Sequence, residues 1–119
     1  MSFDPDLYRR TLRLAGRGQN GQDLNLSVID AGPRDALRTI VFLHGMGGYA
    51  GYWHHQFNHF YEGSRVIAPD LRGHGLSDAP ISTYSRDELL GDIEAALALL
   101  DVPAQFILVT HSFSGALGT

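Results

Sequence analysis

The sequence predicts an α/β fold, a mostly parallel sheet with helices on both faces. Three short apolar runs, Thr39–Leu43, Arg65–Pro69 and residues 106–109, lack the polar alternation of a half-exposed strand. Such runs are typical of parallel strands that are buried on both faces. Segments with helical periodicity separate the runs, so strands and helices alternate along the chain, as crossovers between parallel strands require.

An antiparallel hairpin is expected before these strands. Residues 11–15 and 24–29 alternate apolar and polar side chains, and they flank the glycine-rich residues 16–21. Asn20 and Gly21 supply the positive-φ positions that a tight connection needs.

The first helix is expected over residues 49–61. Its aromatic residues recur at helical spacing, so one face is expected to pack on the sheet. These residues are Trp53, Phe57, Phe60 and Tyr61. His55 and His59 lie one turn apart on the other face, a spacing that can bind a metal ion. Because no acidic residue or third ligand accompanies them, we favour a solvated surface and expect neither a metal nor a cofactor.

The second helix is expected to begin at a capping box formed by Ser85 and Glu88. Its apolar residues fall on one face, and the helix is expected to end before Pro103. The apolar face consists of Leu89, Ile93, Ala96, Leu97 and Leu100.

Composition excludes several classes of function. The 119 residues carry a net charge of −4, which gives no basic patch for nucleic acid or anionic membranes. The chain has no Cys and no Lys, so thiolate nucleophiles, Cys-type zinc sites, Walker-type phosphate loops and Schiff bases are excluded. No apolar run approaches the roughly 18 residues of a membrane span, and no signal peptide is recognisable, so we expect a cytoplasmic protein.

The last fifteen residues have the layout of a strand, a turn and a helix. The strand at residues 106–109 is followed by small residues on both sides of Ser112, and a helix is expected from Gly115. A serine nucleophile requires this context, since the sharp turn raises its side chain above the sheet. A serine that merely caps a helix is the alternative for this segment taken alone.

This segment resembles the nucleophile elbow of the α/β-hydrolase superfamily, whose usual pattern is Gly-x-Ser-x-Gly. Thr110 and Ser114 stand here where that pattern has glycine. Glycine suits the elbow because the nucleophile sits in a strained backbone conformation that costs about 1–3 kcal/mol. The resemblance implies that Ser112 is the nucleophile.

Residues 44–48, His-Gly-Met-Gly-Gly, follow a buried strand and resemble the His-Gly loop of the same superfamily. The resemblance implies two oxyanion donors, the backbone N–H groups of Met46 and Phe113, with His44 and Gly45 supporting the loop. Taken alone, the segment also fits an ordinary connection between a strand and a helix.

Residues 70–78 resemble the Asp-x-Arg-Gly-x-Gly-x-Ser loop that follows the fourth strand in this superfamily. We expect Asp70 and Arg72 to hold the loop by hydrogen bonds and an ion pair, and we interpret His74 as an ordinary loop residue. Three matches in the right order identify residues 11–119 as similar to the superfamily, which implies the strand order 1-2-4-3-5.

The resemblance implies a serine hydrolase that acts on ester or related acyl bonds of a small-molecule substrate. The triad order is Ser, then Asp or Glu, then His, but only seven residues follow Ser112. We therefore expect residues 1–119 to be a partial α/β-hydrolase domain that lacks the C-terminal strands and the triad acid and His. A fragment covering less than half of a domain of roughly 250 residues is expected to be inactive alone.

Two expectations complete the interpretation. Because Thr110 and Ser114 replace the elbow glycines, a non-catalytic α/β-hydrolase-like binding protein is the alternative function. In the strand order 1-2-4-3-5, residues 106–109 form a bare apolar edge, and such edges pair with other chains. Oligomerisation or aggregation through that edge is expected.

Overall fold

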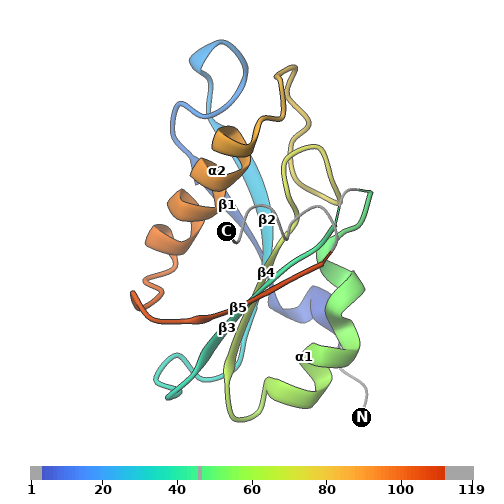
Figure 1. Ribbon diagram of the computed structural model, residues 1–119, viewed down its shortest axis with the longest axis vertical. Coiled ribbons are helices and arrows are strands. Elements are labelled where there is room, and N and C mark those ends of the chain that lie inside the picture. The colour runs from blue at the N-terminus through green and yellow to red at the C-terminus, as the bar shows by residue number, and fades with distance from the viewer. Residues whose placement is uncertain (1–3, 46, 112–119) are drawn as a thin grey trace.

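The computed structural model of the chain describes residues 4–45 and 47–111. It confirms the α/β class: the five strands form one mixed sheet in the order β1-β2-β4-β3-β5, the order expected from the sequence. The strands are β1 (Arg9–Leu14), β2 (Leu24–Ala31), β3 (Thr39–Leu43), β4 (Arg65–Pro69) and β5 (Ile107–Thr110), and Figure 1 shows their arrangement.

The expected hairpin is present. β1 pairs antiparallel with β2, with Leu14 opposite Leu24. Asn20 and Gly21 in the connection have positive φ values of 55° and 77°, as the sequence indicated, and Gly16 has a φ of 70°. β2 also pairs antiparallel with β4, which joins the hairpin to the parallel part of the sheet.

The parallel part consists of β4, β3 and β5. β3 lies between the other two, with Thr39 opposite Arg65 and Leu43 opposite Thr110. β5 begins one residue later than expected. It extends to Thr110, beyond the last apolar residue, because Thr110 pairs with Leu43 of β3. Within the described residues β5 therefore has a strand partner on one side only.

Helices cover both faces of the sheet, as expected (Figure 1). α2 (Arg86–Leu99) lies on one face, and α1 (His54–Phe60), preceded by the 3-10 turn η3 (Ala50–Trp53), lies on the other. The turn replaces the first part of the helix expected over residues 49–61. The two faces of this helical segment are as expected, since Trp53 and Phe57 are buried while His55 and His59 are exposed.

Alternation along β3 shows why its sequence is continuously apolar from Ile40 to Leu43. Val41 and Leu43 belong to the core cluster that includes α2, whereas Ile40 and Phe42 belong to the cluster that includes α1. Successive side chains of a strand point to opposite faces, so burial of both faces leaves no position for a polar residue.

The capping box that was expected at the start of α2 is confirmed. Ser85 Oγ accepts a hydrogen bond from the Glu88 N–H (3.2 Å), and Glu88 Oε1 accepts one from the Ser85 N–H (3.3 Å). The helix then buries Leu89, Ile93 and Ala96 against the sheet.

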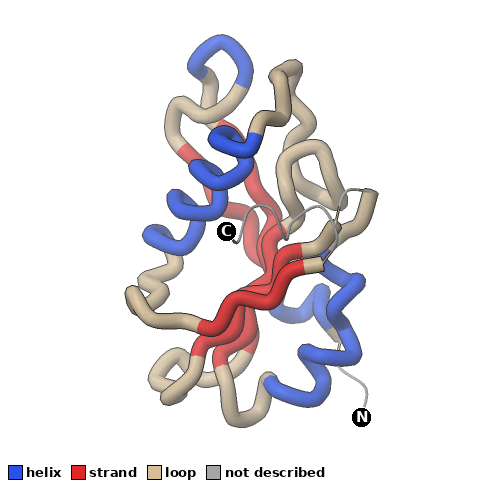
Figure 2. The backbone as a smooth tube through the Cα atoms, viewed as in Figure 1, coloured by secondary structure: helices blue, strands red, loops and turns tan. Residues whose placement is uncertain are grey.

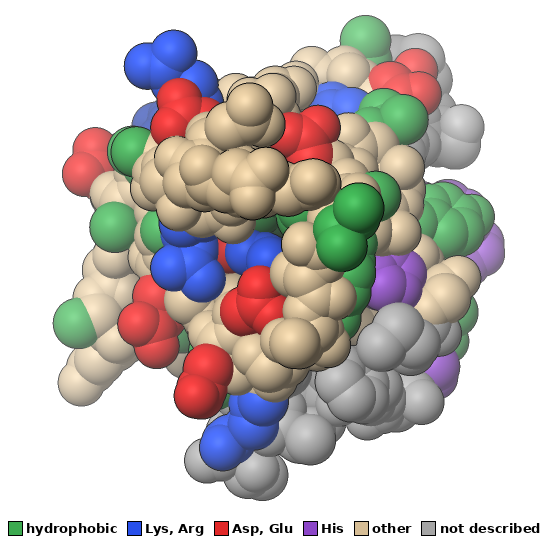
Figure 3. Space-filling view, turned by 90° about the horizontal axis from the view of Figure 1, so that it is seen from above, with side chains coloured by type: hydrophobic (Ala, Val, Ile, Leu, Met, Phe, Trp, Pro, Cys, Tyr) green, Lys and Arg blue, Asp and Glu red, His purple; other side chains and the backbone are tan. Residues whose placement is uncertain are grey.

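Charged side chains of both signs lie next to one another on the face shown in Figure 3. In the described part of the chain, no helix combines the length and the apolar composition that crossing a membrane requires.

The two edges of the sheet differ in character. β1 carries Arg9, Arg10 and Arg13, and charged residues are one means by which edge strands avoid pairing with other chains. β5 instead exposes Ile107 and Leu108 by 45% and 39%.

We therefore expect the 119-residue chain by itself to oligomerise or aggregate through β5. Leu108→Lys is expected to shift the population toward monomer, because a lysine on an edge strand opposes pairing. Leu76→Lys, at a site that is 70% exposed in the loop after β4, is the control and is expected to leave the oligomers unchanged. Size-exclusion chromatography with light scattering at micromolar concentration measures both. A sharp monomer peak for the unaltered chain contradicts the expectation.

Candidate active site

The candidate site lies where the parallel strands end. Leu43 of β3 is opposite Thr110 of β5, and the His111 N–H donates a hydrogen bond to the Leu43 carbonyl (3.2 Å). The connections that follow these two strands therefore begin side by side (Figure 2). Ligands of α/β sheets bind at this end of the strands.

Only part of the expected site lies within the described residues. His44 and Gly45 directly follow β3, and Thr110 is the last residue of β5. Met46, Ser112, Phe113 and Ser114 lie outside the described residues, so their expected roles stay predictions.

His44 is fully buried, and both of its ring nitrogens are engaged. Nε2 accepts a hydrogen bond from the Leu71 N–H (3.0 Å), and Nδ1 lies 2.8 Å from the Gly45 carbonyl oxygen. Since Nε2 is an acceptor, Nδ1 carries the proton and donates to Gly45. His44 thus connects the loop after β3 to the loop after β4 and offers no free nitrogen for general-base chemistry.

The environment of His44 favours its neutral form. Burial is the main cause that lowers the pKa of His44 below the ordinary value of 6.5, and the nearby His74 acts in the same direction. The contact with the Gly45 carbonyl and the charge of Asp70 oppose this shift without cancelling it. A neutral imidazole is also the form that can accept the Leu71 N–H.

Acid is therefore expected to destabilise the fold through His44. Since the folded-state pKa is lowered, the unfolded chain binds more protons, so this stabilisation is complete above about pH 6.5 and is lost as pH falls toward the folded-state value. Urea unfolding at several pH values is expected to show a shallower acid-side slope for His44→Gln than for the unaltered protein. His59→Gln, on the exposed face of α1, is the control. Equal slopes for all three proteins contradict the prediction.

His74, which the sequence indicated only as a loop residue, contacts the glycine loop. Its Nε2 accepts a hydrogen bond from the Gly47 N–H (3.0 Å), and its Nδ1 lies 3.0 Å from the Arg72 carbonyl oxygen. The His44 and His74 rings lie 5.0 Å apart. Each of the two loops therefore supplies an imidazole that accepts a backbone N–H of the other loop.

Asp70 holds the start of the loop after β4, as expected. Its buried carboxylate accepts hydrogen bonds from the N–H groups of Ala50 (2.6 Å) and Leu76 (3.1 Å), and it pairs with Arg9 on β1 (3.0 Å). Gly75 has a φ of 51°, and a Cβ at this position would lie 2.3 Å from the Asp70 carboxylate. Glycine is thus required at position 75 for the loop to close over Asp70.

Arg72 holds the same loop from a buried position, and its charged partners lie on α2. Nε and Nη2 donate to the two carboxylate oxygens of Asp92 at 2.6 and 2.7 Å, and Nη1 pairs with Glu88 at 2.8 Å. Arg17, in the connection between β1 and β2, also donates to Asp92 (2.7 Å). Asp70 and Arg72 therefore each hold the loop through an ion pair, but with Arg9 and with Asp92 and Glu88 rather than with one another. Asp92 was missed because it lies within the buried face of the helix.

A cluster of aromatic rings, formed by Tyr52, Trp53 and His111, lies at the end of β5 and was missed by the sequence interpretation. The rings of Tyr52 and His111 lie 4.9 Å apart, and the Tyr52 hydroxyl is 3.4 Å from His111 Nε2. The buried ring of Trp53 packs edge-on against His111 at 6.4 Å. Tyr52 remains 47% exposed, so a ligand at this end of the sheet has an aromatic surface available.

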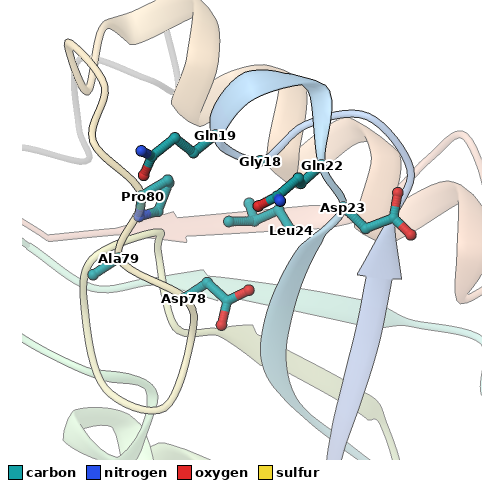
Figure 4. A pocket seen from close by; sticks show the side chains of 8 residues that line it. All are labelled: Gly18, Gln19, Gln22, Asp23, Leu24, Asp78, Ala79 and Pro80. Carbon is teal, nitrogen blue, oxygen red and sulfur yellow. The ribbon is translucent and has the colours of Figure 1, made fainter.

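Two hollows lie near the loops. One, of about 560 Å³, is lined by Gly47, Gly48, His74, Tyr84 and their neighbours, so it adjoins the candidate site. The other, of about 240 Å³, lies between the hairpin connection and residues 78–80 (Figure 4). Its lining includes no residue of the loop after β3, so we assign it no part in the site. Among the described residues, no group of three or more His, Asp or Glu side chains is arranged to hold a metal ion.

Comparison with known proteins decides the family. The family of the alpha/beta hydrolase fold matches residues 38–119, more than half of the chain. The chain belongs to the α/β-hydrolase family. Its sheet order and its helices on both faces are those of the amino-terminal part of that fold.

Curated relatives of this α/β-hydrolase chain carry different names. A non-heme chloroperoxidase of Streptomyces lividans is 39% identical over 92 residues, which cover 76% of this chain and 33% of the relative. Epoxide hydrolase 2 of Siraitia grosvenorii is 36% identical over 97 residues, which cover 79% of this chain and 29% of the relative.

Solved structures of α/β hydrolases superimpose on most of the chain. A probable hydrolytic enzyme of Pseudomonas aeruginosa has a TM-score of 0.82 at 32% identity, covering 97% of this chain and 36% of that one. An epoxide hydrolase of Vigna radiata has a TM-score of 0.75 at 31% identity, covering 94% and 34%. This α/β-hydrolase chain therefore spans about a third of the length of the relatives it matches.

Proposed function

We propose that the chain is the amino-terminal part of a serine hydrolase that acts on ester or related acyl bonds, with Ser112 as nucleophile. The observation that carries the proposal is the pairing of Leu43 with Thr110. Because of it, the residues that follow β5 start beside the loop that begins with His44 and Gly45. A nucleophile and a glycine loop that begin at adjacent strand ends are the two parts that acyl transfer needs close together.

In the proposed reaction, Ser112 Oγ attacks the carbonyl carbon of the ester while a general base removes its proton. The backbone N–H groups of Met46 and Phe113 donate to the developing oxyanion. The alcohol then leaves with a proton, and water cleaves the acyl-serine by the same steps. His44 and His74 have both ring nitrogens engaged with backbone groups, so we do not assign the base to either of them.

Serine chemistry favours esters over epoxides, although several relatives are named epoxide hydrolases. An alkoxide that opens an epoxide forms an ether with the enzyme, and water does not readily cleave an ether. The same alkoxide forms an ester with an acyl substrate, which water does cleave. The serine at position 112 is therefore suited to repeated turnover of acyl substrates.

We further propose that the active unit is a longer polypeptide. The chain spans about a third of its relatives, and the triad acid and His of this family follow the nucleophile in sequence. In this proposal residues 1–119 form a partial domain that supplies the nucleophile and the oxyanion donors, with His44 and Gly45 supporting the loop. Alone, the chain is inactive or nearly so.

The experiment compares two proteins and two substrates. The 119-residue chain and an extended protein, encoded by an in-frame continuation of the gene, are each assayed with p-nitrophenyl butyrate and with styrene oxide. We expect saturable ester hydrolysis by the extended protein, no catalytic epoxide opening, and ester hydrolysis near background for the short chain. Catalytic epoxide hydrolysis contradicts the substrate class. Absence of all turnover in the extended protein favours the non-catalytic binding protein.

A further inference from the structure

The loop after β3 is held on both sides of position 46 by imidazoles. Ahead of this position, the Gly45 carbonyl accepts hydrogen bonds from His44 Nδ1–H (2.8 Å) and from the Gly48 N–H (2.9 Å). These two hydrogen bonds hold the loop at Gly45. In the proposed reaction the N–H of the next residue, Met46, is the oxyanion donor.

After position 46, the Gly47 N–H donates to His74 Nε2 at 3.0 Å. Gly47 is exposed and has a φ of +81°, a conformation that glycine adopts without steric cost. A glycine in such a loop has many alternative conformations, so one hydrogen bond from outside the loop has a large influence on the populated one. His74 provides that bond from the loop after β4.

His74 is itself held in a fixed orientation. Its Nδ1–H donates to the Arg72 carbonyl at 3.0 Å, and its ring lies 5.0 Å from the buried ring of His44. The Arg72 side chain is buried and bonded to Asp92 on α2. A chain of contacts therefore runs from the core helix through Arg72 and His74 to Gly47.

From this geometry we propose that His74 is a positioning residue for the oxyanion loop. It holds the loop at Gly47, and His44 with Gly48 holds it at Gly45, so the contacts lie on both sides of the proposed donor. The role rests on the proposed function, since it concerns the donor of that reaction. His74 does not touch the substrate in this proposal. Its effect follows from the sensitivity of catalysis to geometry, since a donor misplaced by about 1 Å can lower a rate by roughly 10²-fold.

The kinetic test uses three variants of the extended protein. His74→Phe keeps a ring next to His44 but removes the acceptor, and it is expected to lower kcat for p-nitrophenyl butyrate by about 10–100-fold with little change in KM. His74→Gln carries a carbonyl oxygen that can accept the Gly47 N–H, and it is expected to restore part of the loss. His59→Phe, on the exposed face of α1, is the matched control and is expected to leave kcat unchanged.

A second readout does not depend on catalysis. Hydrogen exchange of the Gly47 amide, followed by NMR in the extended protein, is expected to be slow, to become fast in His74→Phe and to slow again in His74→Gln. Unchanged kcat in His74→Phe, or equal exchange rates in all three proteins, overturns the positioning role while the serine-hydrolase proposal stands. Equal ester turnover by Ser112→Ala overturns both the function and the role of the donor, and the exchange rates then report only the hydrogen bond.

Discussion

Asp92→Asn is expected to lower the free energy of unfolding by about 3–5 kcal/mol, because it leaves a buried arginine without its main counter-charge. Asp92 and Arg72 are exposed by only 1% and 2%, and two hydrogen bonds of 2.6 and 2.7 Å join them. The hydrogen bonds to Asp92 are the main cause that raises the pKa of Arg72. Arginine is not deprotonated in proteins even without such a partner, so the guanidinium stays charged when Asp92 is neutralised.

The remaining contacts do not replace the lost charge. Glu88 also pairs with Arg72, but its side chain is 30% exposed and part of its interaction is screened by water. Arg17 adds a second positive charge next to Asp92. In the described part of the chain, Asp92 is the acidic residue with which Arg17 forms an ion pair. A domain is commonly stable by about 5–15 kcal/mol in total, so the expected loss is a large fraction of the whole.

Urea unfolding of the extended protein, followed by circular dichroism, measures the effect. Glu94→Gln, an exposed position on the same helix, is the control and is expected to change stability by less than about 0.5 kcal/mol. Replacing Asp92 and Arg72 together by Leu and Met is expected to recover much of the loss, because no unpaired charge remains buried. A change in Asp92→Asn as small as in the control contradicts the prediction.

The sheet could be predicted from the sequence because burial on both faces leaves a simple pattern. β3 alternates between the two core clusters, with Phe42 facing α1 and Leu43 facing α2, so every position from Ile40 to Leu43 is apolar. The end of β5 was harder to place. Thr110 belongs to the strand because it pairs with Leu43, and pairing with a distant strand is not visible in local hydrophobicity.

The connections between loops could not be predicted for a similar reason. Asp92 lies between Leu89 and Ile93 on the buried face of α2, and that face was predicted from its apolar residues alone. Its partner Arg72 is twenty residues away in the sequence. A charged residue at a buried helical position was the signal that could have revealed it. His74 carried a weaker signal, since its contact with Gly47 depends on how two loops meet in space.

In the candidate site, too, local sequence patterns were predictable and contacts between distant segments were not. The sequence indicated His44 and Gly45 from their place after an apolar strand, and the structure adds what holds them: Leu71 on one ring nitrogen of His44 and the Gly45 carbonyl on the other. The aromatic contact of Tyr52 with His111 joins η3 to the end of β5, which only the folded chain brings together. Ser112, Met46 and Phe113 stay predictions that rest on the resemblance.

Ser112→Ala in the extended protein is expected to lower kcat/KM for p-nitrophenyl butyrate by at least about 10³-fold. A serine hydroxyl paired with a general base forms the acyl intermediate, and alanine has no atom that can form it. Residual hydrolysis is expected from the oxyanion donors, which still stabilise attack by water.

Rapid-mixing kinetics make this prediction sharper, because an acyl intermediate that accumulates releases a stoichiometric burst of p-nitrophenol. The burst is expected in the extended protein and absent in Ser112→Ala. Ser114→Gly is the matched control: it removes the neighbouring hydroxyl and restores the glycine of the usual elbow pattern, so activity is expected to be kept or raised.

Equal rates for the extended protein and Ser112→Ala would remove the nucleophile from the proposal, and the replaced glycines at Thr110 and Ser114 would then favour a non-catalytic binding protein. Ser112-dependent turnover by the 119-residue chain alone would instead require a general base within residues 1–119.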